Sequence, residues 1–292
     1  MNKEFNKGLL LAGFGSFWWG FFGVIYFKYI AYIGHIELVV HRCLWTAVML
    51  IVTTTIFSKW KIFFNIVSNI KNLIALFISG FLIFINWSIW IYAVATDRII
   101  DASFGYFIMP IISVLLGYIF FKEKLNNKRI FSIILVFISI LIMVIFNLKS
   151  LPWVGLVVAL SWAFYNLFRK KVNVDTDIGL LIESLFIFPF ALVVFYLITK
   201  NGLNDFNLTN PTLSLFIILA GPMTVIPLFL YVRGVELIGL GPTGMIFYIT
   251  PTLQFILGYF YYNEEFSLVK FVSFIIIWIA VVIYLKDLYE TN

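Results

Sequence analysis

The sequence has few charged residues and a single cysteine. Only 12% of its 292 residues are Asp, Glu, Lys or Arg, whereas 63% are hydrophobic. A water-soluble surface cannot be assembled from such a composition, so lipid is expected to be the main solvent. The lone Cys43 allows no intramolecular disulfide and no cysteine-rich metal site. In its apolar stretch we expect it to act as a small buried hydrophobic residue.

The sequence motifs of common soluble enzymes are also missing. There is no GxxxxGK[ST] nucleotide loop, no HExxH zinc motif, no GxSxG nucleophile turn and no EF-hand calcium loop. We therefore expect no cofactor, no metal and no enzymatic activity. The net charge of +6 is spread in short clusters between apolar runs, which argues against a nucleic-acid partner.

Long apolar runs fill almost the whole chain. A hydrocarbon core of about 30 Å needs about 20 apolar helical residues to cross it. Runs of this size cover residues 8–29, 37–57, 71–95, 103–121, 129–146, 153–170, 178–199, 212–235, 242–262 and 268–285. The sequence thus predicts an all-α integral membrane protein with ten transmembrane helices, and residues 58–70 suit a short interfacial helix.

The loop charges predict the orientation of these helices. If the N-terminus lies in the cytoplasm, fourteen Lys and Arg residues fall on the inner side and five on the outer side. Cytoplasmic loops carry the excess of positive charge in membrane proteins. Both termini are therefore expected in the cytoplasm, and the protein in the inner membrane of a bacterium.

The two halves of the chain repeat one motif. Residues 107–123 align with residues 248–264, so that Pro110 meets Pro251 and Glu123 meets Glu264. Near the same offset, Trp19 meets Trp162. We expect one five-helix repeat in residues 1–148 and a second in 149–292. Because five is odd, the second repeat must be inverted, which is the architecture of alternating-access carriers, although a channel or a membrane enzyme could share it.

Ionisable residues within apolar runs are costly unless they are paired, hydrated or functional. Glu37 and His41 are four residues apart and share a helical face, and Arg42 follows them. These three residues could form a proton relay or a substrate anchor, or an ion-paired helix start that holds two helices together.

Charged residues also occur at two further places in the apolar runs. Glu183 has no cation within one helical turn, and it is either a protonatable carboxylate or a carboxylate that reaches water at the membrane boundary. Arg233 and Glu236 are three residues apart and are expected to form a local ion pair. The candidates for coupling or ion pairing are therefore Glu37, His41, Arg42, Glu183 and Arg233.

Polar and aromatic residues gather near the middle of several runs, among them Asn86, Trp87, Trp90, Tyr106, Phe247 and Tyr248. A cavity with such walls would bind an amphipathic organic molecule by stacking and cation–π contacts. The chain has 34 Phe, 15 Tyr and 9 Trp, so core packing also explains any single aromatic. Asn86 places a carboxamide within an apolar run, where a polar group is costly, and a functional role is therefore favoured for this residue.

Motifs throughout the chain resemble the RarD-type (chloramphenicol-sensitive protein) branch of the EamA-containing drug/metabolite transporter superfamily. The resemblance is carried by Trp19-Gly20, Tyr26-Phe27-Lys28, Glu37 with His41-Arg42 and Trp45, Ile85-Asn86-Trp87, Ala102 to Ile108 before Pro110, Leu151-Pro152-Trp153, Arg169-Lys170, Gly179 with Glu183, Gly221-Pro222 with Thr224, Ile226-Pro227-Leu228, and Tyr248-Ile249 with Pro251-Thr252. It implies an inner-membrane permease or exporter of small organic solutes.

By position in that superfamily, the resemblance implies a substrate cavity that involves Trp19, Asn86, Trp90, Tyr106, Tyr165, Phe247 and Tyr248. The leading hypothesis is a carrier of a small amphipathic molecule, embedded in the lipid bilayer and driven by protons or by the substrate's own gradient. A channel and an integral-membrane enzyme are the alternatives.

Overall fold

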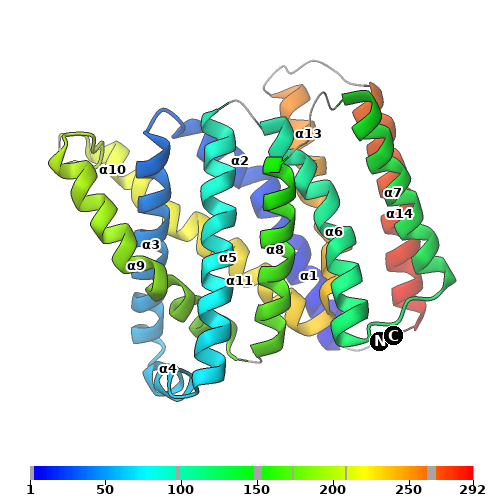
Figure 1. Ribbon diagram of the computed structural model, residues 1–292, viewed down its shortest axis with the longest axis horizontal. Coiled ribbons are helices and arrows are strands. Elements are labelled where there is room, and N and C mark those ends of the chain that lie inside the picture. Colours follow the sequence, from blue (N-terminus) through cyan, green and yellow to red (C-terminus); the bar gives the residue numbers. More distant parts are fainter. Residues whose placement is uncertain are drawn as a thin grey trace.

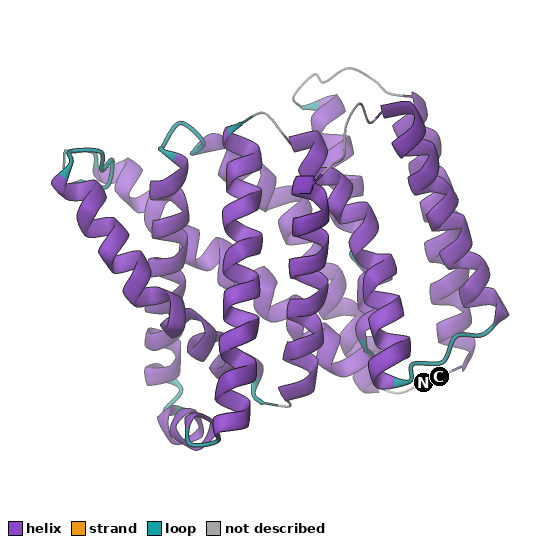
Figure 2. Cartoon of the chain, viewed as in Figure 1, coloured by secondary structure: helices purple, strands orange, loops and turns teal. Residues whose placement is uncertain are grey.

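The computed structural model describes residues 3–96, 99–147, 153–172, 174–207, 209–261 and 268–291. Leu151, Pro152 and Glu264 of the sequence motifs lie outside the described residues, as do the loop cations Arg98 and Lys149 and the side chains of residues 102–104. Within the described ranges every regular element is a helix (Figure 2), so the expected all-α fold is confirmed.

The helices follow the apolar runs closely. They are α1 Lys3–Trp18, the π-helical turn η1 Trp19–Gly23, α2 Val24–Tyr29, α3 His35–Ile56, α4 Trp60–Val67, α5 Ile70–Ala95, α6 Ile99–Phe121, α7 Asn127–Asn147, α8 Trp153–Val172, α9 Thr176–Lys200, α10 Pro211–Ile218, α11 Ala220–Ile238, α12 Leu240–Ile246, α13 Ile249–Phe260 and α14 Leu268–Thr291. The short α4 lies in the segment for which an interfacial helix was expected.

Seven helical stretches among the described residues are long and apolar enough to cross a membrane. They are Lys3–Tyr29, His35–Ile56, Ile70–Ala93, Asn127–Phe146, Thr176–Lys200, Pro211–Ile238 and Leu268–Thr291. The ten predicted spans are therefore not confirmed as such. Gly105–Phe121 in α6 is apolar but shorter, α8 ends in three basic residues, and the ninth run is divided between α12 and α13.

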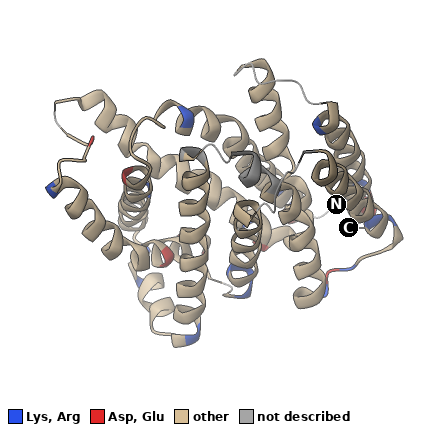
Figure 3. Ribbon diagram, turned by 45° about the horizontal axis from the view of Figure 1, so that its top comes forward, with Lys and Arg blue, Asp and Glu red and all other residues tan. Residues whose placement is uncertain are grey.

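Large apolar side chains point outward from these helices, for example Phe137, Ile145, Phe190 and Val282, each more than half exposed. Charged residues lie mostly at helix ends, and the helices between them are nearly free of charge (Figure 3). An apolar belt of this kind suits a lipid surround, and the chain is a multi-pass membrane protein.

The helices pack in pairs that bring the two halves of the sequence together (Figure 1). α1 lies along α11 and α5 lies along α8, while α3 packs on α9 and α6 packs between α8 and α12. α7 and α14 form a pair of their own, joined by a hydrogen bond from Ser139 to the carbonyl oxygen of Ser273. The N- and C-termini lie side by side at one end of the bundle (Figure 1).

At that end, ion pairs connect segments that are distant in sequence, except for Arg233 and Glu236, which pair within α11. We call the following pairs the ionic layer: Lys59–Asp177 (2.6 Å), Lys170–Glu123 (3.0 Å), Arg129–Asp287 (2.8 Å), Arg169–Glu236 (3.7 Å) and Arg233–Glu236 (2.8 Å). Glu123 also accepts hydrogen bonds from the backbone N–H groups of Leu240 and Gly241, at the start of α12. Gly239 makes this start possible, because it has φ +98° and only glycine adopts such a backbone readily.

A close helix contact at Gly221 gives a stability prediction. A Cβ atom there would lie 2.5 Å from the carbonyl oxygen of Trp45, so α11 and α3 would have to separate. We expect Gly221→Ala to lower the free energy of unfolding by about 1–3 kcal/mol, the usual cost of overpacking. Thermal unfolding of the purified protein, followed by tryptophan fluorescence, measures the effect.

The control is Gly34→Ala, because a Cβ atom at Gly34 meets nothing within 4 Å. An equal loss of stability in both variants would contradict the packing of α11 on α3 described above.

Candidate functional site

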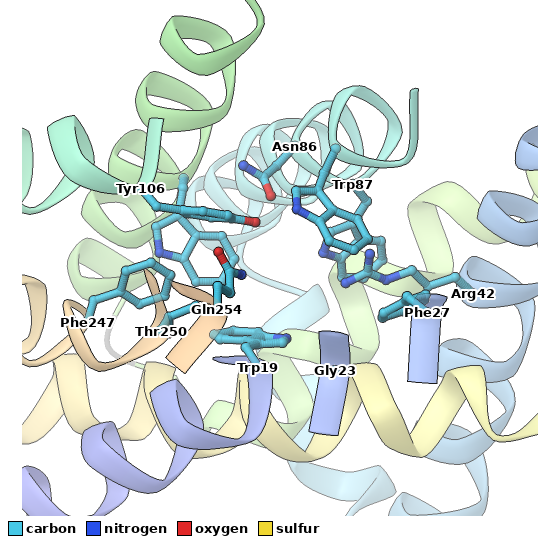
Figure 4. A pocket seen from close by; sticks show the side chains of 12 residues that line it. Trp19, Gly23, Phe27, Arg42, Asn86, Trp87, Tyr106, Phe247, Thr250 and Gln254 are labelled. Atoms are coloured by element: carbon cyan, nitrogen blue, oxygen red, sulfur yellow. The ribbon is translucent and has the colours of Figure 1, made fainter. Parts of the chain in front are cut away.

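A cavity lies between the two halves of the bundle (Figure 4). The empty space inside it and at its open mouth amounts to about 510 Å³, a figure that includes solvent-filled space. Its walls are formed by Trp19, Gly23, Phe27, Arg42, Asn86, Trp87, Trp90, Tyr106, Trp162, Phe247, Thr250 and Gln254. Arg42 lies near the start of α3 and Asn86 in the second half of α5, so the cavity lies away from the ionic layer.

Aromatic rings make up most of the cavity wall. The Trp19 and Trp162 rings meet edge to face with their centroids 4.9 Å apart. Phe247 lies 6.0 Å from Trp162 and 5.7 Å from Tyr106, also measured between ring centroids. Such rings offer large apolar surfaces for stacking against a flat or apolar ligand.

Polar groups converge on the cavity from four helices. Asn86 donates hydrogen bonds from Nδ2 to the carbonyl oxygen of Val158 (2.9 Å) and to Ser161 Oγ (3.1 Å), both on α8. These bonds fix the carboxamide so that its oxygen faces the cavity (Figure 4). Gln254 extends into the centre from α13, and the hydroxyl of Tyr106 points toward it from α6 (Figure 4).

Arg42 supplies the positive charge of the cavity. Its Nε donates a hydrogen bond to Thr224 Oγ1 at 3.0 Å, and the side chain is only 5% exposed. The guanidinium carbon lies 4.9 Å from the ring centroid of Phe27 and 4.7 Å from that of Trp87. These contacts hold the cation in place by cation–π attraction.

A second polar cluster surrounds Glu183 on α9. Its Oε1 accepts a hydrogen bond from Ser79 Oγ at 2.5 Å and lies 3.4 Å from Arg169 Nε. Its Oε2 accepts a bond from the Tyr165 hydroxyl at 3.3 Å. Glu183 and Arg169 are 2% and 0% exposed, so this pair is fully buried between α5, α8 and α9. Arg169 also reaches Glu236, which links the cluster to the ionic layer.

A family comparison identifies the chain. The model of the EamA-like transporter family matches residues 6–145 and, a second time, residues 150–286. The chain belongs to the EamA-like transporter family. Protein RarD of Escherichia coli (strain K12) is 32% identical over 290 residues, which cover 99% of this chain and 97% of that protein. The resemblance to RarD-type proteins is thereby confirmed.

A second relative and one solved structure are also similar to this chain. A protein described as an uncharacterized transporter of Vibrio cholerae serotype O1 is 33% identical over 286 residues, which cover 98% of this chain and 94% of that protein. A solved crystal structure superposes with a TM-score of 0.72 over 95% of this chain and 96% of the other, at 11% identity. At that identity the likeness concerns the fold alone. The chain is therefore a membrane transporter of known fold.

The structure of this EamA-like transporter brings five of the seven predicted substrate-binding residues to one cavity. These five residues are Trp19, Asn86, Trp90, Tyr106 and Phe247. The other two point elsewhere. Tyr165 donates its hydroxyl to Glu183, and Tyr248 donates its hydroxyl to the carbonyl oxygen of Phe107 at 2.8 Å. The role of all seven in binding remains a prediction.

The predicted coupling residues of this EamA-like transporter are distributed over separate sites. Arg42 lines the cavity. Glu37 Oε1 lies 3.3 Å from His41 Nε2 and also accepts hydrogen bonds from the backbone N–H groups of Asp205 and Phe206, so Glu37 ties the start of α3 to the loop between α9 and α10.

Of the remaining two residues, Arg233 belongs to the ionic layer and Glu183 is joined to it through Arg169. Glu183 is buried and paired with Arg169, which disagrees with a carboxylate that reaches water at the membrane boundary. Arg233 Nη1 lies 2.8 Å from Glu236 Oε2, as expected for a local pair.

The site also contains residues that the sequence analysis did not propose as cavity residues, namely Gly23, Phe27, Trp162, Thr250 and Gln254. Two of them carried a usable signal. Trp162 is the repeat counterpart of Trp19, and the two rings meet in the cavity. Gln254 is a carboxamide inside an apolar run, like Asn86.

Proposed function

We propose that this EamA-like transporter is a secondary carrier that moves a small amphipathic organic molecule across the bacterial inner membrane by alternating access. The observation that supports it most is the cavity between the halves, which has aromatic walls and a few polar groups from α3, α5, α6 and α13. The ionic layer lies between this cavity and one end of the bundle, and it acts as the closed gate on that side.

Alternating access needs two related halves, and two observations support them. The family model matches residues 6–145 and 150–286 separately. Helices of one half also pack on helices of the other half. α1 of the first half packs along α11 of the second, and α8 of the second half packs along α5 of the first. We propose ten crossings, with α6, α8 and the α12–α13 pair crossing beside the seven long helical stretches. Residues 1–148 and 149–292 then form two inverted repeats.

The side of the membrane follows from the loop charges. We propose that both termini and the ionic layer face the cytoplasm, so the cavity opens outward in this state.

Appending the same tag to either terminus tests the arrangement. Both tags should be degraded by protease only in inside-out vesicles. A tag at either terminus that is degraded in right-side-out vesicles would contradict it.

Glu183 is the proposed coupling residue. It touches α5 through Ser79 and α8 through Tyr165 and Arg169, so a change in its charge would alter the packing of three helices at once. Proton binding at this carboxylate would weaken its attraction to Arg169 and loosen the neighbouring ionic layer.

The experiment that tests the carrier function has two steps. A thermal-shift screen of metabolites identifies a ligand, because a molecule that binds the folded state raises the melting temperature. Uptake of that ligand is then measured in proteoliposomes. A carrier shows saturable uptake that is accelerated by unlabelled ligand inside the vesicles. Flux that rises linearly with concentration would indicate a channel, and chemical conversion of the ligand would indicate an enzyme.

A further inference from the structure

The inference concerns the charge of the molecule that the cavity binds, and it rests on the proposed function. Three arginine side chains are buried among the described residues. Arg129 pairs with Asp287 at 2.8 Å, and Arg169 pairs with Glu183 at 3.4 Å. Arg42 alone of the three has no carboxylate within ion-pair distance among the described side chains.

Two buried acids, Glu37 and Glu183, do not neutralise Arg42 because both are bound to other groups. Glu37, on the same helix, contacts His41 and two backbone N–H groups of the loop after α9. Glu183 is held by Arg169, Ser79 and Tyr165. A buried cation without a counter-ion is costly in a lipid-embedded protein, so its retention inside a cavity calls for a ligand that neutralises it.

The guanidinium group of Arg42 is also positioned to receive such a ligand. Thr224 binds its Nε, and the rings of Phe27 and Trp87 pack against it, so its orientation is fixed. Neither of its two Nη atoms makes a hydrogen bond to a described residue. The group points from α3 toward the centre of the cavity, where Gln254 and Tyr106 also point (Figure 4).

We propose that the substrate of this carrier is an organic anion, with a carboxylate bound by Arg42 and an aromatic or apolar body stacked on Trp19, Trp162 and Phe247. Planar guanidinium groups bind carboxylates through two parallel hydrogen bonds, which gives geometric as well as charge selectivity. Gln254 and Asn86 provide amide groups for the remaining polar atoms of the ligand. The negative charge of the bound substrate then neutralises the positive charge of Arg42 while the substrate crosses the membrane.

Three probes of one ring system but different charge test this inference. Purified wild-type protein is heated with millimolar indole-3-acetate, indole-3-acetamide or tryptamine, which are anionic, neutral and cationic. The expected result is a rise in melting temperature with indole-3-acetate that is at least twice the rise with the other two. Equal shifts, a larger shift with tryptamine, or no shift with indole-3-acetate would overturn the proposal.

Variants then show whether Arg42 is responsible. Arg42→Gln should lose the extra shift caused by indole-3-acetate, and Arg42→Lys should keep part of it, because a lysine retains the charge but not the fork of donors. Lys128→Gln is the matched control, since it removes one exposed positive charge far from the cavity, at the α7–α14 pair. A full anion-specific shift in Arg42→Gln would overturn the assignment. If Arg42→Gln does not fold, Arg42→Lys and the wild-type comparison still decide it.

The binding test and the transport test distinguish a failure of the anion inference from a failure of the carrier function. Anion-selective binding without counterflow in proteoliposomes would support the anion site at Arg42 and contradict the carrier function. Saturable counterflow of indole-3-acetamide or tryptamine, with none for indole-3-acetate, would leave the carrier function standing and remove the inference.

Discussion

Glu183→Gln should lower the free energy of unfolding by about 3 kcal/mol, because it leaves Arg169 as a buried cation with only Glu236 at 3.7 Å nearby. Transport should fall to a small fraction of the wild-type rate as well, since the same carboxylate is the proposed coupling residue. Chemical or thermal unfolding in detergent measures the first effect, and uptake in proteoliposomes measures the second.

The double variant Glu183→Gln with Arg169→Gln separates the two roles. It removes both charges, so no buried cation is left, and most of the lost stability should return. Transport should stay low if Glu183 couples transport to protons. Recovery of both stability and transport would show that Glu183 serves only to neutralise Arg169.

Asn86→Ala should reduce transport about tenfold or more while the protein still folds. The change removes a carboxamide oxygen that faces the cavity and two hydrogen bonds that orient it, each of which contributes about 0.5–1.5 kcal/mol. Initial uptake rates at several substrate concentrations measure the effect.

Ser161→Ala is the matched control for Asn86. It removes one of the two acceptors on α8, but Ser161 does not line the cavity. The expected result is a small change in uptake, because Nδ2 keeps its bond to Val158. If Ser161→Ala reduced transport as much as Asn86→Ala, the role of Asn86 would be limited to joining α5 to α8.

The positions of the helices could be predicted because they depend on length and apolarity, which are local properties of the sequence. α3, α5, α7 and α9 each begin and end within about two residues of the corresponding apolar run, within the usual uncertainty of helix ends. The number of crossings was harder to predict. Asn166 and the basic residues at the end of α8 lower its hydropathy, and the break at Phe247 and Tyr248, between α12 and α13, divides the ninth run.

The direction of individual side chains could not be predicted. In a soluble helix the apolar face marks the core, but in lipid the outer face is as apolar as the inner one. Nothing in the sequence therefore shows that Tyr248 faces Phe107 while its neighbour Phe247 lines the cavity. The partner of Glu183 could not be predicted for a related reason, because Arg169 lies on a different helix and sequence spacing predicts contacts only within one helix.

In an alternating-access carrier, the cavity is reached from each side of the membrane in turn. The most direct measurement is the labelling of a cysteine at Gln254, which lines the cavity, in a Cys43→Ala background. A membrane-impermeant maleimide is added to right-side-out and to inside-out vesicles. We expect the Gln254→Cys variant to be labelled in both preparations. Labelling that never occurs from the cytoplasmic side would contradict it.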